Sequence, residues 1–216
     1  MVIGEIFFLI LEILGTVSFA VSGAMAAIEK RVDLFGVIFL GITTSLAGGI
    51  IRDVVIGRVP PAAFSDYKYM VIAIESALVV FLLARIYQDL YKNNVELIDT
   101  INNVFDAAGL GAFTITGANV AITLGYHENG FFVVFLAMVT GIGGGILRDL
   151  MIREIPFVLR KRIYAVASLA GGCIYYLLYV KLHVEIMAAA FVGIAVVFGL
   201  RMMATIFKWN LPKAFK

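Results

Sequence analysis

Arginine and aspartate stand side by side after a glycine cluster at two places in the chain. The first stretch reads AGGIIRD and ends at Asp53, and the second reads GGGILRD and ends at Asp149. Both lie in long apolar segments, where a charged side chain at the bilayer centre costs about 2.5–3.5 kcal/mol. We therefore expect Arg52, Asp53, Arg148 and Asp149 to face the interior of a helical bundle, beside a path that ions could use.

Other polar residues of the apolar segments could guide or bind a cation. Glu12 and Asp106 are two such carboxylates, and intramembrane carboxylates commonly mark ion pathways. Hydroxyl and amide oxygens could replace the water around a dehydrating cation. The candidates of this second kind are Ser22, Thr43, Thr44, Ser45, Thr116, Asn119 and Thr140. The alternative is structural, because a carboxylate can bond a neighbouring helix and a hydroxyl often bonds back to its own helix.

The charged residues also predict ion pairs. Neighbours on a helix point about 100° apart, so we do not expect each arginine to pair with the aspartate beside it. We expect pairing between the two stretches, Arg52 with Asp149 and Arg148 with Asp53. A purely structural pair would fit the same residues. Glu75 and Arg201 could form a further pair.

Residues for other kinds of chemistry do not occur in suitable patterns. The glycine-rich GIGGGILRD lacks the Gly-Lys-Ser/Thr ending that a phosphate-binding loop needs. His127 and His183 stand apart, without a second metal ligand at suitable spacing. We therefore expect no enzyme, no metal site and no cofactor. A net charge of +2 gives no reason to expect nucleic acid as a partner.

The composition indicates which elements position these residues. Of the 216 residues, 62% are hydrophobic and 15% are charged, and the mean hydropathy is +1.01; soluble domains are about half apolar and a quarter charged. Seven segments match the roughly 20 apolar residues that cross a bilayer. They cover 5–28, 34–57, 69–91, 98–123, 130–153, 162–181 and 184–208. The sequence predicts an all-α integral membrane protein with one transmembrane domain, 1–216.

Lysine and arginine predict the orientation of these spans, because cytoplasmic connections carry an excess of both. If the N-terminus lies outside, only four of the 17 basic residues fall on the outer side: Arg52, Arg58, Lys68 and Lys181. We therefore expect a multi-pass protein of the cell inner (plasma) membrane, with its N-terminus outside and its C-terminus in the cytoplasm.

Two blocks of the first half recur in the second half. FAVSGAMAA from Phe19 matches FTITGANVA from Phe113 at an offset of 94 residues. VIFLGITTSLAGGIIRD from Val37 matches VVFLAMVTGIGGGILRD from Val133 at an offset of 96. Each copy holds three spans, so the second copy must enter the membrane from the opposite side. This predicts a 3+3 inverted-topology repeat, residues 5–91 and 98–181, followed by a seventh helix at 184–208.

The glycine clusters fall near the centres of the second and fifth spans. An interior glycine weakens a helix by about 1 kcal/mol relative to alanine, and irregular backbone survives in a membrane beside a wet cavity. The predicted helix-break residues are Gly48, Gly49, Gly143, Gly144 and Gly145. Close packing of two helices is the alternative role for such small residues.

Taken together, these motifs resemble the prokaryotic TRIC (trimeric intracellular cation) channel family, which is related to bacterial membrane proteins described as glycine transporters. The resemblance covers about residues 5–208. It is carried by FAVSGAMAA, AGGIIRD, FDAAGLGAFTITGA, TGIGGGILRD and IPFVLRKRIYA. It implies a homotrimer in membrane lipid, with no soluble protein partner, and glycine-broken second and fifth helices around a pore in each protomer. Monovalent cations, chiefly potassium, would permeate.

A secondary transporter is the alternative function. Inverted repeats with midplane breaks are also typical of carriers that work by alternating access, and a small solute such as glycine would then be the substrate. No cluster of aromatic side chains with one charge lies near either glycine cluster in the sequence. This favours an ion, so a potassium-permeable channel is the main prediction.

Overall fold

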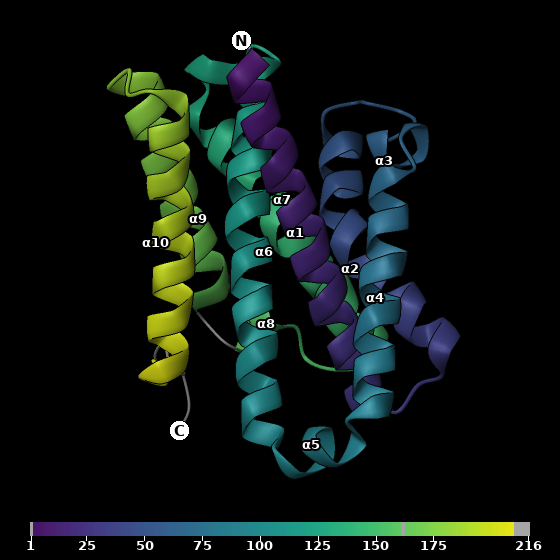
Figure 1. The fold of residues 1–216 in the computed structure, drawn as a ribbon. Helices are drawn as coiled ribbons and strands as arrows, with labels where there is room; N and C mark the ends of the chain where they lie inside the picture. The colour runs from purple at the N-terminus through teal and green to yellow at the C-terminus, as the bar shows by residue number, and fades with distance from the viewer. Residues whose placement is uncertain (1, 161–162, 210–216) are drawn as a thin grey trace.

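The computed structural model describes residues 2–160 and 163–209, whose regular elements are all helical (Figure 1). Seven helices in these residues are long and apolar enough to cross a membrane, which confirms the seven predicted spans. They are α1 (Val2–Glu29), α2 (Leu34–Val55), α4 (Lys68–Ile86), α6 (Val95–Thr123), α7 (Gly130–Met151), α9 (Ile163–Tyr176) with its π-helical continuation η2 (Leu177–Lys181), and α10 (Ile186–Ile206). The connections hold α3 (Ala62–Ser65), α5 (Gln88–Asn93), η1 (Tyr126–Glu128) and α8 (Phe157–Arg160).

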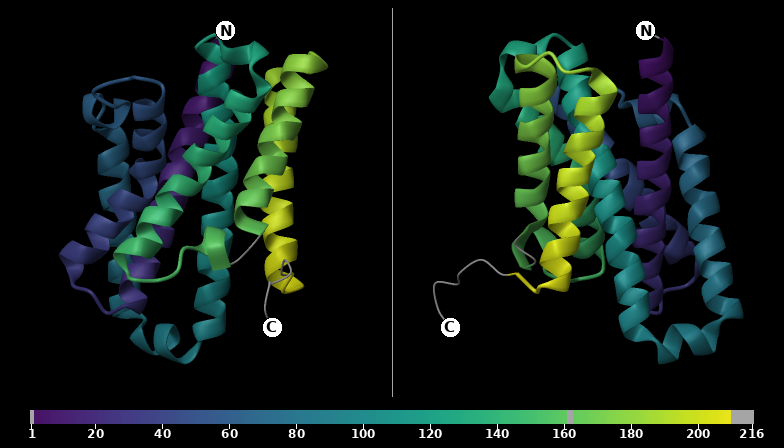
Figure 2. Two further views of the ribbon diagram at one scale, coloured as in Figure 1. Left: turned by 180° about the vertical axis from the view of Figure 1, so that it is seen from behind. Right: turned by 60° about the vertical axis from the view of Figure 1, so that its left-hand side comes forward.

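The long helices form two units of three. α4 packs on α1 and α2, and α9 packs on α6 and α7 in the same manner. α1 and α6 run in opposite directions, as an inverted repeat requires (Figures 1 and 2). The units meet through α1, α2, α6 and α7, while α10 packs on α6 and α9. Four helices therefore surround the centre of the molecule. α10 covers one side of the second unit and also touches α1, and the first unit has no such additional helix in the described part of the chain.

Matching residues also begin the two central helices α2 and α7. The Asp33 side chain accepts a hydrogen bond from the Gly36 N–H at 2.8 Å, at the start of α2. The Asn129 side chain accepts one from the Phe132 N–H at 3.1 Å, at the start of α7. Each cap satisfies one of the amides that a helix leaves without a partner at its first turn.

The predicted helix breaks are wrong, because α2 and α7 continue without interruption through their glycines. The glycines serve a close crossing of the two helices instead. A Cβ atom on Gly48 would lie 2.1 Å from the carbonyl oxygen of Thr140, and one on Gly144 would lie 2.0 Å from the carbonyl oxygen of Thr44. The alternative role, close packing of small residues, is the one that the structure shows for these two.

The remaining glycines of the two clusters have different surroundings. A Cβ atom on Gly143 would lie 3.1 Å from the Cα of Gly48, so this glycine belongs to the same crossing. A Cβ atom on Gly145 would meet the hydroxyl oxygen of Tyr164 at 2.7 Å. Gly49 has room for a Cβ atom, since the nearest atom to that position is an Arg52 guanidinium nitrogen at 3.8 Å, an ordinary van der Waals distance. Only Gly49 could therefore accept a side chain without displacing a neighbour.

Reciprocal contacts join α1 and α6 as well. The ring of Phe113 lies against Gly15, and the ring of Phe19 lies against Gly109. The two rings face each other with centroids 5.3 Å apart. Each contact is the other one shifted by 94 residues, the offset seen in the sequence.

Candidate functional site

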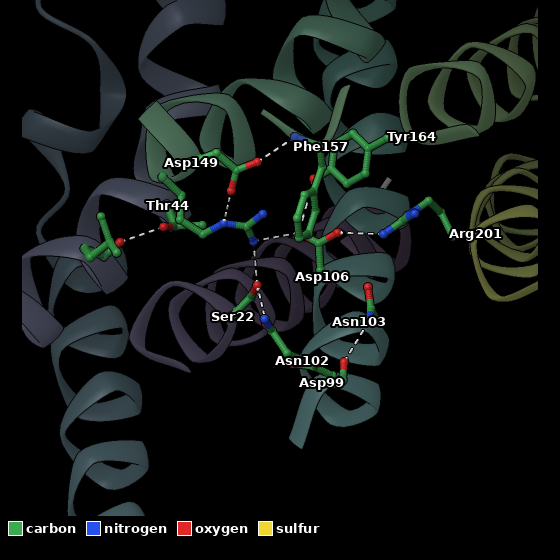
Figure 3. A network of polar contacts seen from close by, with 12 residues as sticks. Ser22, Thr44, Asp99, Asn102, Asn103, Asp106, Asp149, Phe157, Tyr164 and Arg201 are labelled. Carbon is green, nitrogen blue, oxygen red and sulfur yellow. Dashed lines mark hydrogen bonds and ion pairs between the residues drawn. The ribbon is translucent and has the colours of Figure 1, made fainter. Parts of the chain in front are cut away.

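The second Arg-Asp pair is the centre of a buried polar network (Figure 3). Arg148 is only 1% exposed. Its Nε donates to Asp149 Oδ1 at 2.9 Å, and its Nη1 donates to Asp106 Oδ1 at 2.9 Å and to Ser22 Oγ at 2.7 Å. One guanidinium therefore holds α1, α6 and α7 together.

Asp106 extends this network to α10. Its Oδ2 accepts a hydrogen bond from Arg201 Nη2 at 3.2 Å, and its Oδ1 accepts one from the Tyr164 hydroxyl at 3.3 Å. The Arg201 guanidinium also lies over the Tyr164 ring, 4.8 Å from its centroid. Arg201 does not form the pair with Glu75 that the sequence left open, because the buried arginine has the buried Asp106 carboxylate beside it, whereas Glu75 is exposed on α4.

Each arginine of the two stretches pairs with the aspartate next to it, so the predicted cross-pairs are wrong. Arg52 Nε donates to Asp53 Oδ1 at 2.8 Å, as Arg148 does to Asp149. The long guanidinium side chain folds back along the helix and overcomes the unfavourable angle between neighbours.

The contacts of the second carboxylate oxygen explain why neither aspartate pairs with the arginine of the other stretch. Asp53 Oδ2 accepts from the Ala62 N–H at 2.8 Å, and Asp149 Oδ2 accepts from the Phe157 N–H at 2.6 Å. Ala62 and Phe157 are the first residues of α3 and α8. Each aspartate therefore fixes the connection that follows its own helix.

A cavity of about 300 Å³ opens beside the first Arg-Asp pair and is called the outer cavity, after the orientation predicted from the sequence. The predicted residues on its wall are Glu12, Ser45, Gly49, Arg52, Asp53, Thr116 and Thr140. The Glu12 carboxylate accepts a hydrogen bond from the Tyr69 hydroxyl. At the rim, the Lys68 ammonium hydrogen-bonds Asp66 at 2.7 Å and lowers the pKa of that carboxyl, which therefore stays charged.

A second cavity of about 210 Å³ lies at the opposite end of the central helices and is called the inner cavity. Its charged lining residues are Glu29, Lys30, Asp99, Arg148, Asp149 and Glu154. The Lys30 ammonium lies 2.5 Å from a Glu154 carboxylate oxygen, so an ion pair joins the α1–α2 connection to the segment after α7. No residue of the described chain lines both cavities.

Some predicted ligands do not reach either cavity. The Thr43 hydroxyl donates to the Phe39 carbonyl at 2.8 Å, and the Thr44 hydroxyl donates to the Leu40 carbonyl at 2.6 Å. Asn119 Oδ1 accepts from the Tyr175 hydroxyl at 3.2 Å. These three side chains have the structural role that was the alternative.

The prediction missed the two tyrosines that bind the matched carboxylates. Tyr69 binds Glu12 in the first copy, and Tyr164 binds Asp106 in the second. Both stand at the beginning of the third span of their copy, at an offset of 95 residues, and alignment of these two weakly similar spans would have found them.

Comparison with known proteins gives the family. Residues 9–85 and 103–180 match a family model described as glycine transporter. A crystal structure of a prokaryotic TRIC channel in 0.5 M KCl superposes with a TM-score of 0.84 at 35% identity, covering 96% of this chain and 100% of that one. The chain belongs to the prokaryotic TRIC family.

Other relatives are similar over nearly the whole chain. A TRIC orthologue from Rhodobacter sphaeroides has a TM-score of 0.83 at 30% identity, covering 94% of this TRIC family member and 99% of that chain. The inner membrane protein YadS of Escherichia coli K12 is 34% identical over 93% of this chain and 92% of its own length. YvgT, a membrane protein of Bacillus subtilis, is 36% identical over 94% of both. This TRIC family member is a multi-pass membrane protein.

Proposed function

We propose that this protein conducts monovalent cations, chiefly potassium, along a path inside each protomer between α1, α2, α6 and α7. The observation that carries the proposal is the pair of charged cavities at opposite ends of these four helices. The similar solved structures are those of TRIC cation channels, one of them in 0.5 M KCl. Together they favour conduction over a purely structural role.

The charges of the two cavities suit a cation. The outer cavity carries three carboxylates, Glu12, Asp53 and Asp66, and two guanidinium groups, Arg52 and Arg58. The inner cavity carries four carboxylates and two basic groups. An excess of carboxylates along a pore attracts cations and repels anions.

The Arg148 network closes the path in this conformation. Ser22, which binds Arg148, stands on α1 between Glu12 of the outer cavity and Ala26 of the inner cavity. Two guanidinium nitrogens of the network, Arg148 Nη2 and Arg201 Nε, are buried without a hydrogen-bond partner among the described residues. A buried donor without a partner raises the free energy of this conformation, which favours rearrangement of the network. Conduction requires Arg148 to move away from Ser22.

Planar-bilayer recording of the purified protein tests the proposal. With a potassium gradient across the bilayer, we expect discrete unitary currents that reverse at the potassium equilibrium potential. Bilayers that remain silent, with the protein shown to be folded and inserted, would contradict a channel.

A carrier of a small solute such as glycine is the second candidate. The observation in its favour is that Arg148 and Asp149 of the network line the inner cavity, whereas no residue of the network lines the outer cavity. A carrier that works by alternating access likewise opens its central site to one side at a time. A zwitterion could place its ammonium at Glu12 and its carboxylate at Arg52 in the outer cavity. Saturable, gradient-coupled glycine uptake into vesicles, together with silent bilayers, would favour the carrier.

We also propose a homotrimer with the N-terminus outside and the C-terminus in the cytoplasm, and no cofactor beyond the permeant ion. The R. sphaeroides relative is named a trimeric channel orthologue, and the lysine and arginine distribution supports the orientation. Protease removal of a C-terminal tag from inverted vesicles, but not from spheroplasts, is the expected result. Native mass spectrometry should give the mass of three chains.

A further inference from the structure

A long groove runs along the membrane-facing side of α1, between α4 and α6, and is called the α4–α6 groove. Its apolar part has a volume of about 640 Å³. The wall residues that matter here are Val17, Val21, Ser76, Val80 and Ile101. In Figures 1 and 2, α4 and α6 stand on either side of α1, and α5 joins them across one end.

The inverted repeat identifies the counterpart of this groove. Shifted by the offsets of 94 residues for α1 with α6 and 95 for α4 with α9, the five wall positions become Gly111, Ile115, Gly171, Tyr175 and Phe7. α10 packs on these counterparts, and the surface that they form is called the seat of α10. The contacts are Gly111 with Ile194, Gly171 with Val197, Ile115 and Tyr175 with Gly193, and Phe7 with Phe191. The α4–α6 groove is therefore the place where a counterpart of α10 would lie.

The groove is not shaped for a closely packed helix. α10 approaches its seat closely because Gly111 and Gly171 have no side chains, and a Cβ atom on Gly171 would lie 2.2 Å from Val197. The same two positions of the groove carry Val17 and Ser76. Helices associate in membranes mainly through small residues that allow close backbone approach. A flexible apolar chain suits this wall better than a helix does.

The groove continues past Met25 and Ala84 into a second chamber of about 760 Å³ at the α5 end. Its wall carries two basic side chains, Arg31 and Lys92, and two acidic ones, Glu29 and Asp99. None of these four forms an ion pair with another residue in the described part of the chain. A ligand that carries charges of both signs would complement them.

Tyr91 stands where the apolar part and the chamber meet. Its hydroxyl oxygen is buried and has no hydrogen-bond partner among the residues that the structure describes. Burial raises the pKa of Tyr91 to about 12, so the hydroxyl keeps its proton and can donate. A buried donor without an acceptor is costly, which indicates an acceptor that the chain itself does not supply.

We propose that the α4–α6 groove binds one zwitterionic, amine-bearing phospholipid per protomer, with phosphatidylethanolamine as the ligand. The acyl chains fill the apolar part. The phosphate accepts hydrogen bonds from Tyr91, Arg31 and Lys92, and the ammonium group lies beside Glu29 and Asp99. Glu29 and Asp99 also line the inner cavity, so the bound lipid would lie beside one end of the proposed ion path, but its retention can be measured whether or not the path conducts ions.

Native mass spectrometry of the full chain in detergent tests the site. With phosphatidylethanolamine and phosphatidylglycerol added in equal amounts, we expect one retained phosphatidylethanolamine per protomer. The double variant Arg31→Gln, Lys92→Gln should lower this retention about tenfold, equivalent to about 1.4 kcal/mol. Tyr91→Phe should lower the retention several-fold. Arg85 is an exposed basic residue of α4 that lines neither part of the groove, so the control variant Arg85→Gln should leave the retention unchanged.

Three results would overturn the proposal. The first is equal retention of the two lipids, and the second is unchanged retention in the double variant. The third concerns Ser76→Phe, which narrows the groove. We expect this variant to lose the lipid and to keep its oligomeric mass. If it loses the oligomer, and the unaltered protein retains no lipid, a neighbouring copy fills the groove and the proposal is wrong.

Discussion

Arg52 and Arg148 occupy matching positions, yet their surroundings differ. The side chain of Arg148 is 1% exposed and reaches Asp106 on a neighbouring helix. The side chain of Arg52 is 11% exposed and lines the outer cavity. Glu12 and its counterpart Asp106 each accept from a tyrosine, but only Asp106 pairs with arginines among the described residues. The same motif is therefore buried in a polar network in the second copy and lines the outer cavity in the first.

Arg148→Gln tests whether the Arg148 network is the barrier in the proposed path. The change removes a buried ion-pair partner of Asp106 and Asp149, and breaking such a pair costs about 3–5 kcal/mol. We expect a lower midpoint of thermal unfolding in detergent and more frequent channel openings in bilayers. The double variant Arg148→Gln, Asp149→Asn should recover part of the stability, because Asp149 has no other ion-pair partner among the described residues, whereas Asp106 keeps Arg201. Unchanged stability and unchanged currents in the single variant would show that the network is no barrier.

Glu12→Gln tests the charge of the outer cavity. One unit charge about 4 Å from an ion attracts potassium and repels chloride by roughly 1 kcal/mol each in water, so we expect the potassium-over-chloride permeability ratio to fall by up to about thirtyfold. The reversal potential in a potassium chloride gradient measures this ratio. Glu75→Gln is the matched control, because this intramembrane carboxylate lines neither the outer nor the inner cavity. An equal effect of the two changes would argue against the outer cavity as part of the path.

At the scale of elements, the crossing of α2 and α7 positions both cavities. The seven spans could be predicted because length and apolar composition suffice for a membrane helix. The role of the glycines could not be predicted, because a glycine cluster is typical both of a broken helix and of two helices that cross closely. The position of Thr140 beside Gly48 shows that the close crossing is the correct interpretation. The pairing of Arg52 with Asp53 was also missed, because the pattern shows the direction of a side chain but not how a long one bends.

Alanine at the crossing glycines tests this role. Gly48→Ala would place a Cβ atom 2.1 Å from the Thr140 carbonyl oxygen, and Gly144→Ala would place one 2.0 Å from that of Thr44. The helices must separate, so we expect each change to destabilise the protein by about 1–3 kcal/mol or more. Thermal unfolding in detergent measures the difference from the unaltered protein.

Gly49→Ala is the control for both changes, because Gly49 is the neighbour of Gly48 in α2 and belongs to the same two glycine clusters, yet has room for a Cβ atom. Alanine is the better helix former by about 1 kcal/mol, so this variant should be as stable as the unaltered protein or more stable. If all three alanine variants behaved alike, close approach of α2 and α7 would not be the reason for the glycines.

At the scale of the whole molecule, two inverted copies produce a central bundle with a cavity at each end. The repeat was visible in the sequence because the matched blocks are long, and the contacts of Gly15 and Gly109 show it again in three dimensions. The difference between the two ends was not visible. It arises from α10, which has no counterpart in the first copy and brings Arg201 to Asp106.

The central claim is that ions pass between α1, α2, α6 and α7, and a single cysteine tests it most directly. Gly49→Cys in a Cys173→Ser background places a thiol on the wall of the outer cavity, where there is room for it. A positively charged, water-soluble thiol reagent should reduce the unitary potassium current of this variant in discrete steps. The unaltered protein, whose Cys173 is exposed on α9 away from both cavities, should keep its current. Full labelling of the new cysteine with no change in unitary current would contradict the account.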